Sequence, residues 1–252
     1  MKRLASGTMA LAFAALAFGA GRAQAQQAAA TPAAAPQQQQ DARPGIAVLD
    51  FELGLVLGQD HDSYDALRKG LAALTISELT ANPGIRVVER AQLQQILQEQ
   101  NLGHEGRVSD ESVVQIGKLI GAHYMVTGIL FDNKGDMRID ARIFDTETSQ
   151  ILKTSSVRGH MADLYDMVPR LAQQLMHDAN LPPLERHALE EFRQQNPAPP
   201  TQAVMAYSRA VLYADRGDKD HAVEQYRRAI AAFPGYTQAK NDCNRLQAGA
   251  CS

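Results

Sequence analysis

The hydrophobic pattern of this chain changes its period at Tyr124, and this change limits the folds that the chain can adopt. The stretch from Tyr124 to Phe131 is rich in strand-forming residues, and from Met137 to Ile143 apolar and charged side chains alternate. An alternation of period two predicts a strand with one buried face and one wet face. The turn-forming residues from Asn133 to Asp136 separate the two stretches, so we expect an antiparallel hairpin here.

The region before this hairpin is patterned for helices between short strands. The apolar run from Ile46 to Phe51 predicts a buried strand. A helix is expected to begin near Asp62 or Ser63 and to end at Asn82-Pro83-Gly84, because proline cannot continue the hydrogen-bond ladder. The stretch from Ile85 to Val88 predicts a second short strand.

More helices are predicted on both sides of the hairpin. One runs from about Arg90 to Glu99, and another begins at Glu111 behind a capping Ser109. After a further strand from Ile151 to Val157, a long helix carries Pro169, which should kink or split it. This order predicts an α/β fold with a mixed, largely antiparallel sheet, helices mainly on one face, and a small helical hairpin at the C-terminus. Exposed strand edges can support strand addition or self-association, so a homo-oligomer is one expectation.

The N-terminal residues have the pattern of an export signal followed by a linker. Lys2 and Arg3 precede the short apolar run from Met9 to Ala20, and Ala23-Gln24-Ala25 has the small residues of a cleavage site. We therefore expect a signal peptide over residues 1–25, cleaved near Ala25, with an uncleaved anchor as the alternative. Residues 26–43 are almost wholly Gln, Ala and Pro, a composition typical of a disordered linker.

The charge of the exported chain argues against nucleic acid as a partner. The full sequence has a formal net charge of −3. Removing the three positive charges of Lys2, Arg3 and Arg22, with no acid before Asp41, leaves −6. Nucleic-acid binding needs a clustered basic surface, which this balance does not offer.

The only two cysteines are Cys243 and Cys251, near the C-terminus. In an oxidising compartment, a close and even pair predicts a disulfide. The alternative is two free thiols.

The C-terminal part begins after a Pro-rich break from Gln195 to Thr201. We expect an α/β domain over residues 44–180, a helical and Pro-rich connector over 181–200, and a helical module over 201–252. The module is similar to one tetratricopeptide repeat, a motif of roughly 34 residues. The matching positions are Ala210, Tyr213, Gly217, Ala222, Tyr226, Ala229 and Pro234. Tyr213 and Tyr226 are the candidate partner-binding residues of a groove; a purely structural helical tail is the alternative.

No segment predicts a catalytic, cofactor or metal site. Asp50 and Glu52 follow a buried strand, but no motif places a partner beside them, so a capping or loop hydrogen bond is expected. Glu89-Arg90 is expected to mark a helix start. The histidines form no ligand motif, and neither a phosphate loop nor a nucleophile elbow is present. They are His61, His104, His123, His160, His177, His187 and His221.

The segments IAVLDFE, RVVERAQLQQILQEQ and DTETSQIL, in this order, resemble the CsgG family of curli production and its soluble relatives. The resemblance covers about residues 45–180. It implies a periplasmic location, linked to outer-membrane secretion or assembly, with other envelope proteins as partners.

Two features depart from the family's membrane channel. No cysteine follows the predicted cleavage site to carry a lipid. The connections Asn133–Asp136 and Val157–His160 are also shorter than the roughly 9–11 residues that each membrane-crossing strand needs. We therefore expect no membrane-spanning pore. The predicted function is a non-catalytic periplasmic adaptor, with regulation of a peptidoglycan synthase through protein contacts as the alternative.

Overall fold

The structure is a computed structural model, and it describes residues 41–57, 61–99, 108–183, 185–195 and 197–251. From Asp41 onward the chain gathers in one compact unit. The predicted signal peptide, most of the predicted linker and His104 lie outside the described residues.

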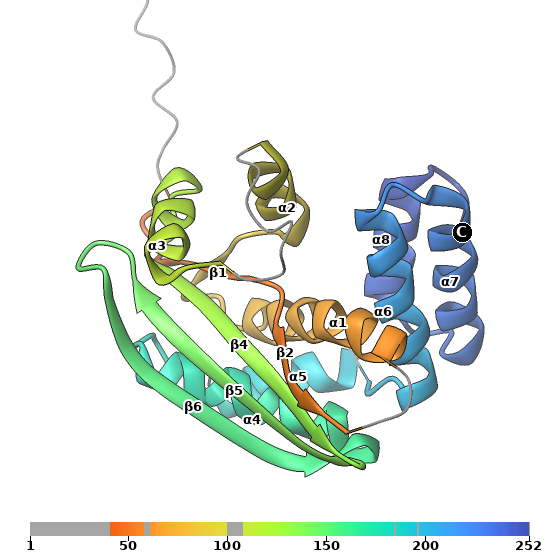
Figure 1. The fold of residues 1–252 in the computed structure, drawn as a ribbon, viewed down its shortest axis with the longest axis horizontal. Coiled ribbons are helices and arrows are strands. Elements are labelled where there is room, and N and C mark those ends of the chain that lie inside the picture. Colours follow the sequence, from red (N-terminus) through yellow and green to blue (C-terminus); the bar gives the residue numbers. More distant parts are fainter. Residues whose placement is uncertain (1–40, 58–60, 100–107, 184, 196, 252) are drawn as a thin grey trace, which may run out of the picture. The chain divides into compact units, whose positions relative to one another are not determined.

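The six strands of the described chain form one mixed sheet in the order β3-β1-β4-β5-β6, with β2 also paired to β4 (Figure 1). The strands are β1 (Gly45–Val48), β2 (Glu52–Val56), β3 (Arg86–Val87), β4 (Tyr124–Asn133), β5 (Asp136–Asp145) and β6 (Gln150–His160). Strand β1 pairs in parallel with β3 and β4, and β2 pairs in parallel with β4, whereas β4, β5 and β6 form an antiparallel meander. The predicted mixed α/β fold and its central hairpin are confirmed.

One face of the sheet is covered along its length, and the other face is covered only near β1 and the adjoining start of β4 and end of β5. Ile46 and Val48 of β1 pack in one cluster with α1 (His61–Thr80) and α4 (Leu164–Asp178). Ala47 and Leu49 pack in another cluster, with α2 (Arg90–Glu99) and α3 (Asp110–Leu119). The longer pair of helices therefore shares one face of the sheet, and the shorter pair packs against the other.

Two local details differ from expectation. The strand predicted from Ile46 to Phe51 ends at Val48, and a separate strand, β2, follows at Glu52. Helix α4 runs through Pro169 without the expected split, and the kink stays a prediction. Pro169 leaves the carbonyl of Tyr165 without its N–H partner, but Val168 and Leu171 on either side of it are buried in the core, and this packing holds the helix together.

The C-terminal helices are α5 (Arg186–Gln195), α6 (Thr201–Asp215), α7 (Lys219–Ala232) and α8 (Thr237–Leu246). Gly217, with φ of +78°, makes the turn between α6 and α7. A second core of small residues and tyrosines joins α6, α7 and α8. The domain boundaries expected from the sequence and the tetratricopeptide-like repeat remain predictions.

Candidate functional site

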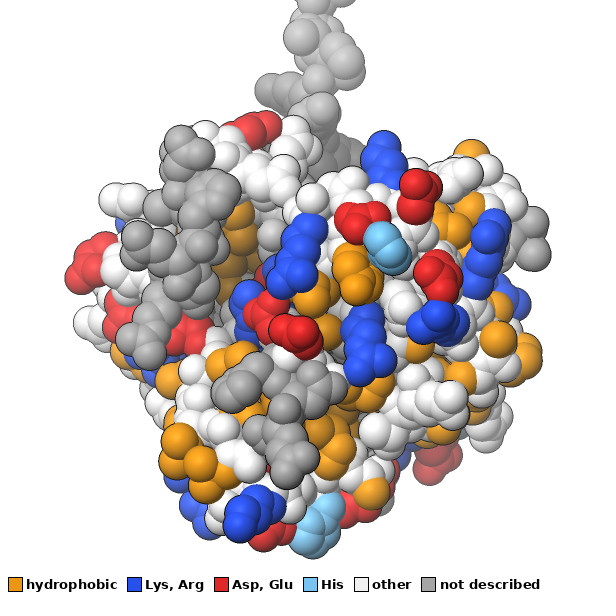
Figure 2. All heavy atoms as spheres, turned by 45° about the vertical axis from the view of Figure 1, so that its right-hand side comes forward, with side chains coloured by type: hydrophobic (Ala, Val, Ile, Leu, Met, Phe, Trp, Pro, Cys, Tyr) orange, Lys and Arg blue, Asp and Glu red, His pale blue; other side chains and the backbone are white. Residues whose placement is uncertain are grey.

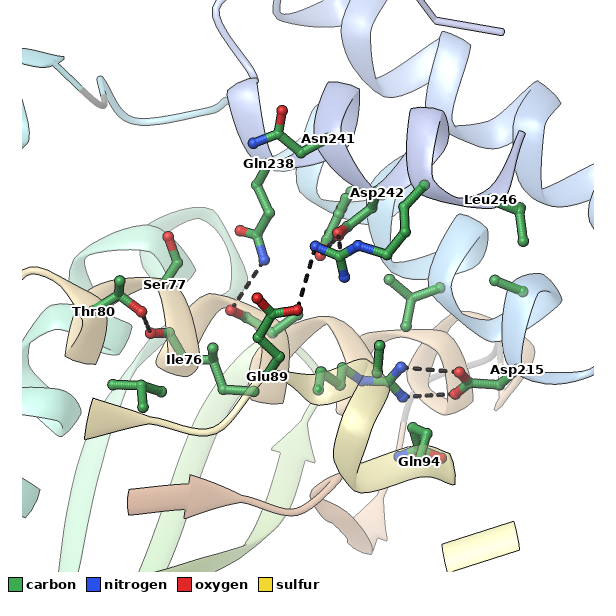
Figure 3. Close-up of a pocket in the computed structure, with 18 of the residues that line it drawn as sticks. Ile76, Ser77, Thr80, Glu89, Gln94, Asp215, Gln238, Asn241, Asp242 and Leu246 are labelled. Atoms are coloured by element: carbon green, nitrogen blue, oxygen red, sulfur yellow. Dashed lines mark hydrogen bonds and ion pairs between the residues drawn. The ribbon is translucent and has the colours of Figure 1, made fainter. Parts of the chain in front are cut away.

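A groove of about 630 Å³ lies between α1 and α2 on one side and α6 and α8 on the other. Figure 3 shows the side chains that line it, and Figure 2 shows this side of the molecule with acidic, basic and apolar side chains interspersed. The apolar part of the lining is Ala73, Ile76, Val87, Val88, Ala91, Phe192, Val211, Ala214 and Leu246. The groove therefore combines a partly apolar lining with polar groups that could orient a bound segment.

Two helices present matching stripes to this groove. On α1 the lining residues are Ala73, Ile76, Ser77 and Thr80, and on α8 they are Gln238, Asn241, Asp242 and Arg245. Both sets follow the spacing i, i+3, i+4, i+7, which places side chains on one face of a helix. The amide of Gln238 reaches across to the carbonyl of Ala73 at 3.4 Å (Figure 3). The tertiary structure thus brings together two helical stripes from opposite ends of the chain.

A nearly buried ion cluster closes one end of the groove. Arg90, at the start of α2, pairs with Asp215 at 2.6 Å and with Asp50 at 2.9 Å. Lys69 of α1 pairs with the same two carboxylates, at 2.6 and 2.7 Å. Burial alone would raise the pKa of Asp50, but Arg90 and Lys69 outweigh it and lower the pKa to about 2. The capping or loop role expected for Asp50 is therefore wrong, whereas the expected helix start at Arg90 is confirmed.

A second set of charges lies at the α8 side. The hydroxyl of Tyr207 donates to Asp242 at 2.7 Å. Arg245 lies 3.6 Å from Asp242 and 3.7 Å from Glu89, which precedes α2. Burial raises the pKa of Asp242, and this effect outweighs the hydrogen bond from Tyr207 and the charge of Arg245. The site therefore holds a carboxylate that its neighbours compensate incompletely.

The structure separates the two tyrosines predicted to bind a partner. Tyr226 is 4% exposed and lines the groove. Tyr213 does not line it; its ring stacks on His221, with the ring centroids 5.2 Å apart. Their predicted role in binding a partner remains a prediction. Asp215, Asp242, Arg245 and Gln238 were not singled out from the sequence, although the polar stripe of α8 was a readable signal.

Cys243 and Cys251 are joined by a disulfide in the structure. Cys243 is fully buried in the second core and directly follows Asp242. The bridge therefore holds the chain end against the helix that forms one wall of the groove.

The described residues offer little for catalysis or metal binding. Neither histidine nor cysteine lines the groove in the described part of the chain. No three His, Cys, Asp or Glu side chains within the described ranges are grouped so that they could hold a metal ion. Glu52 opens β2. None of the helices that the structure describes has both the length and the apolar character needed to cross a bilayer.

The family model "Curli production assembly/transport component CsgG" matches residues 26–133. The resemblance to the CsgG family is confirmed. Within the described structure, the CsgG-like segment extends from β1 to the end of β4 and includes the α1 and α2 side of the groove. No curated protein matches the chain.

Several solved structures are similar to the chain. The C-terminal domain of LpoB from Salmonella enterica is 16% identical, with a TM-score of 0.34, and the match covers 46% of this chain and 82% of that one. TolB from Acinetobacter baumannii is 13% identical, with a TM-score of 0.33, covering 60% of this chain and 29% of TolB. The PelC dodecamer from Paraburkholderia phytofirmans is 11% identical, with a TM-score of 0.30, covering 54% of this chain and 88% of PelC. At these values, the function must be inferred from the chain's own residues.

Proposed function

We propose that this chain is a non-catalytic adaptor of the periplasm and that its groove holds a segment of another envelope protein. The groove between α1, α2, α6 and α8 is the observation that carries this proposal. The matching family is described as an assembly and transport component of curli production, which supports a role in secretion or assembly at the outer membrane.

The polar lining of the groove supports a peptide as the ligand. Gln94 and Gln98 line it on α2, and Gln238 and Asn241 line it on α8. A carboxamide both donates and accepts hydrogen bonds, so such side chains can pair with the N–H and C=O groups of a bound backbone. The apolar lining between them suits the side chains of the same segment.

The charges at the groove support binding without catalysis. Arg90 and Asp215 are occupied with each other and with Lys69 and Asp50. A hydrolytic or transfer site needs a nucleophile beside a base, or a paired acid and base. Among the lining residues that the structure describes, the hydroxyls of Ser77, Thr80 and Thr237 have no histidine beside them in the groove.

Site-specific photocrosslinking tests the proposal. A benzophenone amino acid replaces Gln238, inside the groove, or Lys134, in the turn between β4 and β5, and each variant is produced in the native cells. We expect an adduct with an envelope protein from position 238 only. A secretion or outer-membrane component would support the adaptor, and a peptidoglycan synthase would instead support the regulator. The absence of adducts, or the same adducts from both positions, would contradict the groove as the binding surface.

Self-association through strand edges also remains a prediction. Strand β6 ends the strand order of the sheet among the described residues, and its Ile151 and Leu152 are 44% and 40% exposed. An exposed strand edge with apolar side chains can pair with another chain. The mass of the mature protein in solution checks this expectation, since a monomeric mass over the working concentration range would contradict it.

A further inference from the structure

Arg245 spans the mouth of the groove without tight contact on either side. Its guanidinium lies 3.7 Å from Glu89 and 3.6 Å from Asp242, and its side chain is 54% exposed. Charge-assisted hydrogen bonds between nitrogen and carboxylate oxygen are shorter, about 2.7–2.9 Å. Arg245 is therefore a loosely held cation, in contrast to Arg90 at 2.6 Å from Asp215.

The two carboxylates around Arg245 are short of positive charge. The charged residues that line the groove are Glu89, Arg90, Asp215, Asp242 and Arg245. Arg90 and Arg245 are the two cations among them, and Arg90 is already paired with Asp50 and Asp215. Within the described lining, Arg245 is the one cation left to pair with both Glu89 and Asp242. A second cation, or a better placed one, would find two carboxylates ready to pair with it.

Tyr226 places a hydroxyl among the charged residues of the groove. It is 4% exposed and lines the groove, yet no hydrogen bond joins its hydroxyl to any residue that the structure describes. Its electrostatic neighbours are the charged residues of the groove, Asp242 first among them. A hydroxyl can both donate and accept a hydrogen bond, so a cationic group bound in the groove can donate one to Tyr226.

We infer that the groove takes a partner segment that carries a lysine or arginine between small or aliphatic residues. The cationic group displaces Arg245, pairs with Glu89 and Asp242, and donates a hydrogen bond to the Tyr226 hydroxyl. The flanking residues pack on apolar lining such as Ile76 and Val88. An acidic segment would be repelled by the same two carboxylates. This inference rests on the proposed function, because it names the chemistry of the segment that the groove would hold.

Fluorescence anisotropy with a defined probe tests the inference. The probe is a labelled, amidated nonapeptide, Ala-Ala-Leu-Ala-Arg-Ala-Leu-Ala-Ala, and its partner probe has norleucine in place of arginine. For the wild-type mature protein we expect the arginine probe to bind about tenfold more tightly, the effect of one charge-assisted contact. Glu89→Gln combined with Asp242→Asn should abolish the difference. Glu89→Gln alone, at a 72% exposed side chain, should reduce it without affecting folding.

Variants of Arg245 separate competition from simple support of the fold. Arg245→Ala should tighten binding of the arginine probe by about tenfold, because the resident competitor is gone, and should leave the norleucine probe unchanged. Arg228→Ala is the matched control, because Arg228 pairs with Glu224 on α7 and does not line this groove. Weaker binding of the arginine probe to Arg245→Ala would overturn the inference.

The outcomes distinguish this inference from the function on which it rests. If the two probes bind wild type equally and compete with each other, the groove binds peptides but does not prefer a cationic side chain. That result would overturn the inference and leave the groove as a peptide site. Binding of neither probe would overturn the inference. If crosslinking from position 238 also failed, the proposed function would be contradicted as well. If crosslinking succeeded, the proposed function would be supported although the inference was wrong.

Discussion

Arg90 and Asp215, 125 positions apart in the chain, form a two-point ion pair. Nη1 of Arg90 lies 2.9 Å from Oδ1 of Asp215, and Nη2 lies 2.6 Å from Oδ2. Arg90 begins α2 and Asp215 ends α6, so this pair ties the CsgG-like segment to the C-terminal helices. Because both side chains are only 15% exposed, solvent screens the pair weakly.

Replacing Asp215 with asparagine should weaken this connection. Arg90 and Lys69 would then share the single carboxylate of Asp50, leaving a nearly buried positive charge uncompensated. We expect the free energy of unfolding to fall by about 3 kcal/mol, typical of a broken buried pair. Urea unfolding provides the measurement, with Glu147→Gln in an exposed turn as the control. Equal stability of the two variants would mean that the cluster does not hold the helices.

The free energy of unfolding should decrease at low pH because Asp50 becomes protonated. Its pKa in the folded chain is about 2, below the ordinary value of 3.8. The folded state therefore favours the carboxylate, and its contribution is present above about pH 4 and is lost as the pH falls through about 2. The shift corresponds to about 2 kcal/mol.

This acid dependence can be assigned by comparing two proteins. Urea unfolding midpoints between pH 7 and pH 2 should fall more steeply in the wild type than in Asp50→Asn. The difference reports Asp50 together with its influence on Asp215, which shares Lys69 and Arg90 with it. Parallel curves would show that Asp50 keeps its ordinary pKa.

Gly70 marks the closest approach of α1 to α6. A Cβ built on Gly70 would lie 2.7 Å from Cβ of Ser208 and 3.2 Å from its Cα. Gly70→Ala should therefore destabilise the protein by about 2 kcal/mol through overpacking, despite the better helix propensity of alanine. Thermal unfolding measures the loss. Adding Ser208→Gly should restore part of it; a stable single variant would show that α1 and α6 can move apart freely.

The disulfide should stabilise the wall of the groove. Cys243 and Cys251 are eight positions apart, and closing a loop of this size is worth roughly 2–3 kcal/mol. We expect the double variant Cys243→Ser and Cys251→Ser to lose about this amount and to match wild type measured in reductant. A reductant effect of the same size on the double variant would trace the loss to something other than this bond.

The Tyr226 hydroxyl should matter for binding and not for folding. Because no described residue pairs with it, Tyr226→Phe should change the free energy of unfolding by less than about 0.5 kcal/mol. The same change should weaken the arginine probe several-fold. Alanine is unsuitable here, because Tyr226 is buried in the second core and its removal would leave a cavity. A clear loss of stability in the phenylalanine variant would point to a structural role for the hydroxyl.

Much of the local structure follows from the sequence alone. The alternation after Met137 forms β5, and the turn at Asn133 to Asp136 pairs β4 with β5 as expected. Ser109 caps α3 by accepting a hydrogen bond from the Ser112 N–H. Periodicity, caps and turns are interactions between residues a few positions apart, so the sequence carries them directly.

The tertiary structure decided the groove and its charges. Asp50 follows β1 in the sequence, but the packing of α1 and α2 around β1 determines that it meets Lys69 and Arg90. Gln238 and Ala73, 165 positions apart, meet only because α8 lies against α1. Such contacts depend on which buried faces pack together, and the same polar stripe on α8 would be a solvated helix face in another packing. The sequence therefore determined the helices and strands and pointed to Tyr226, which lines the groove. Long-range packing determined which charged residues surround that tyrosine.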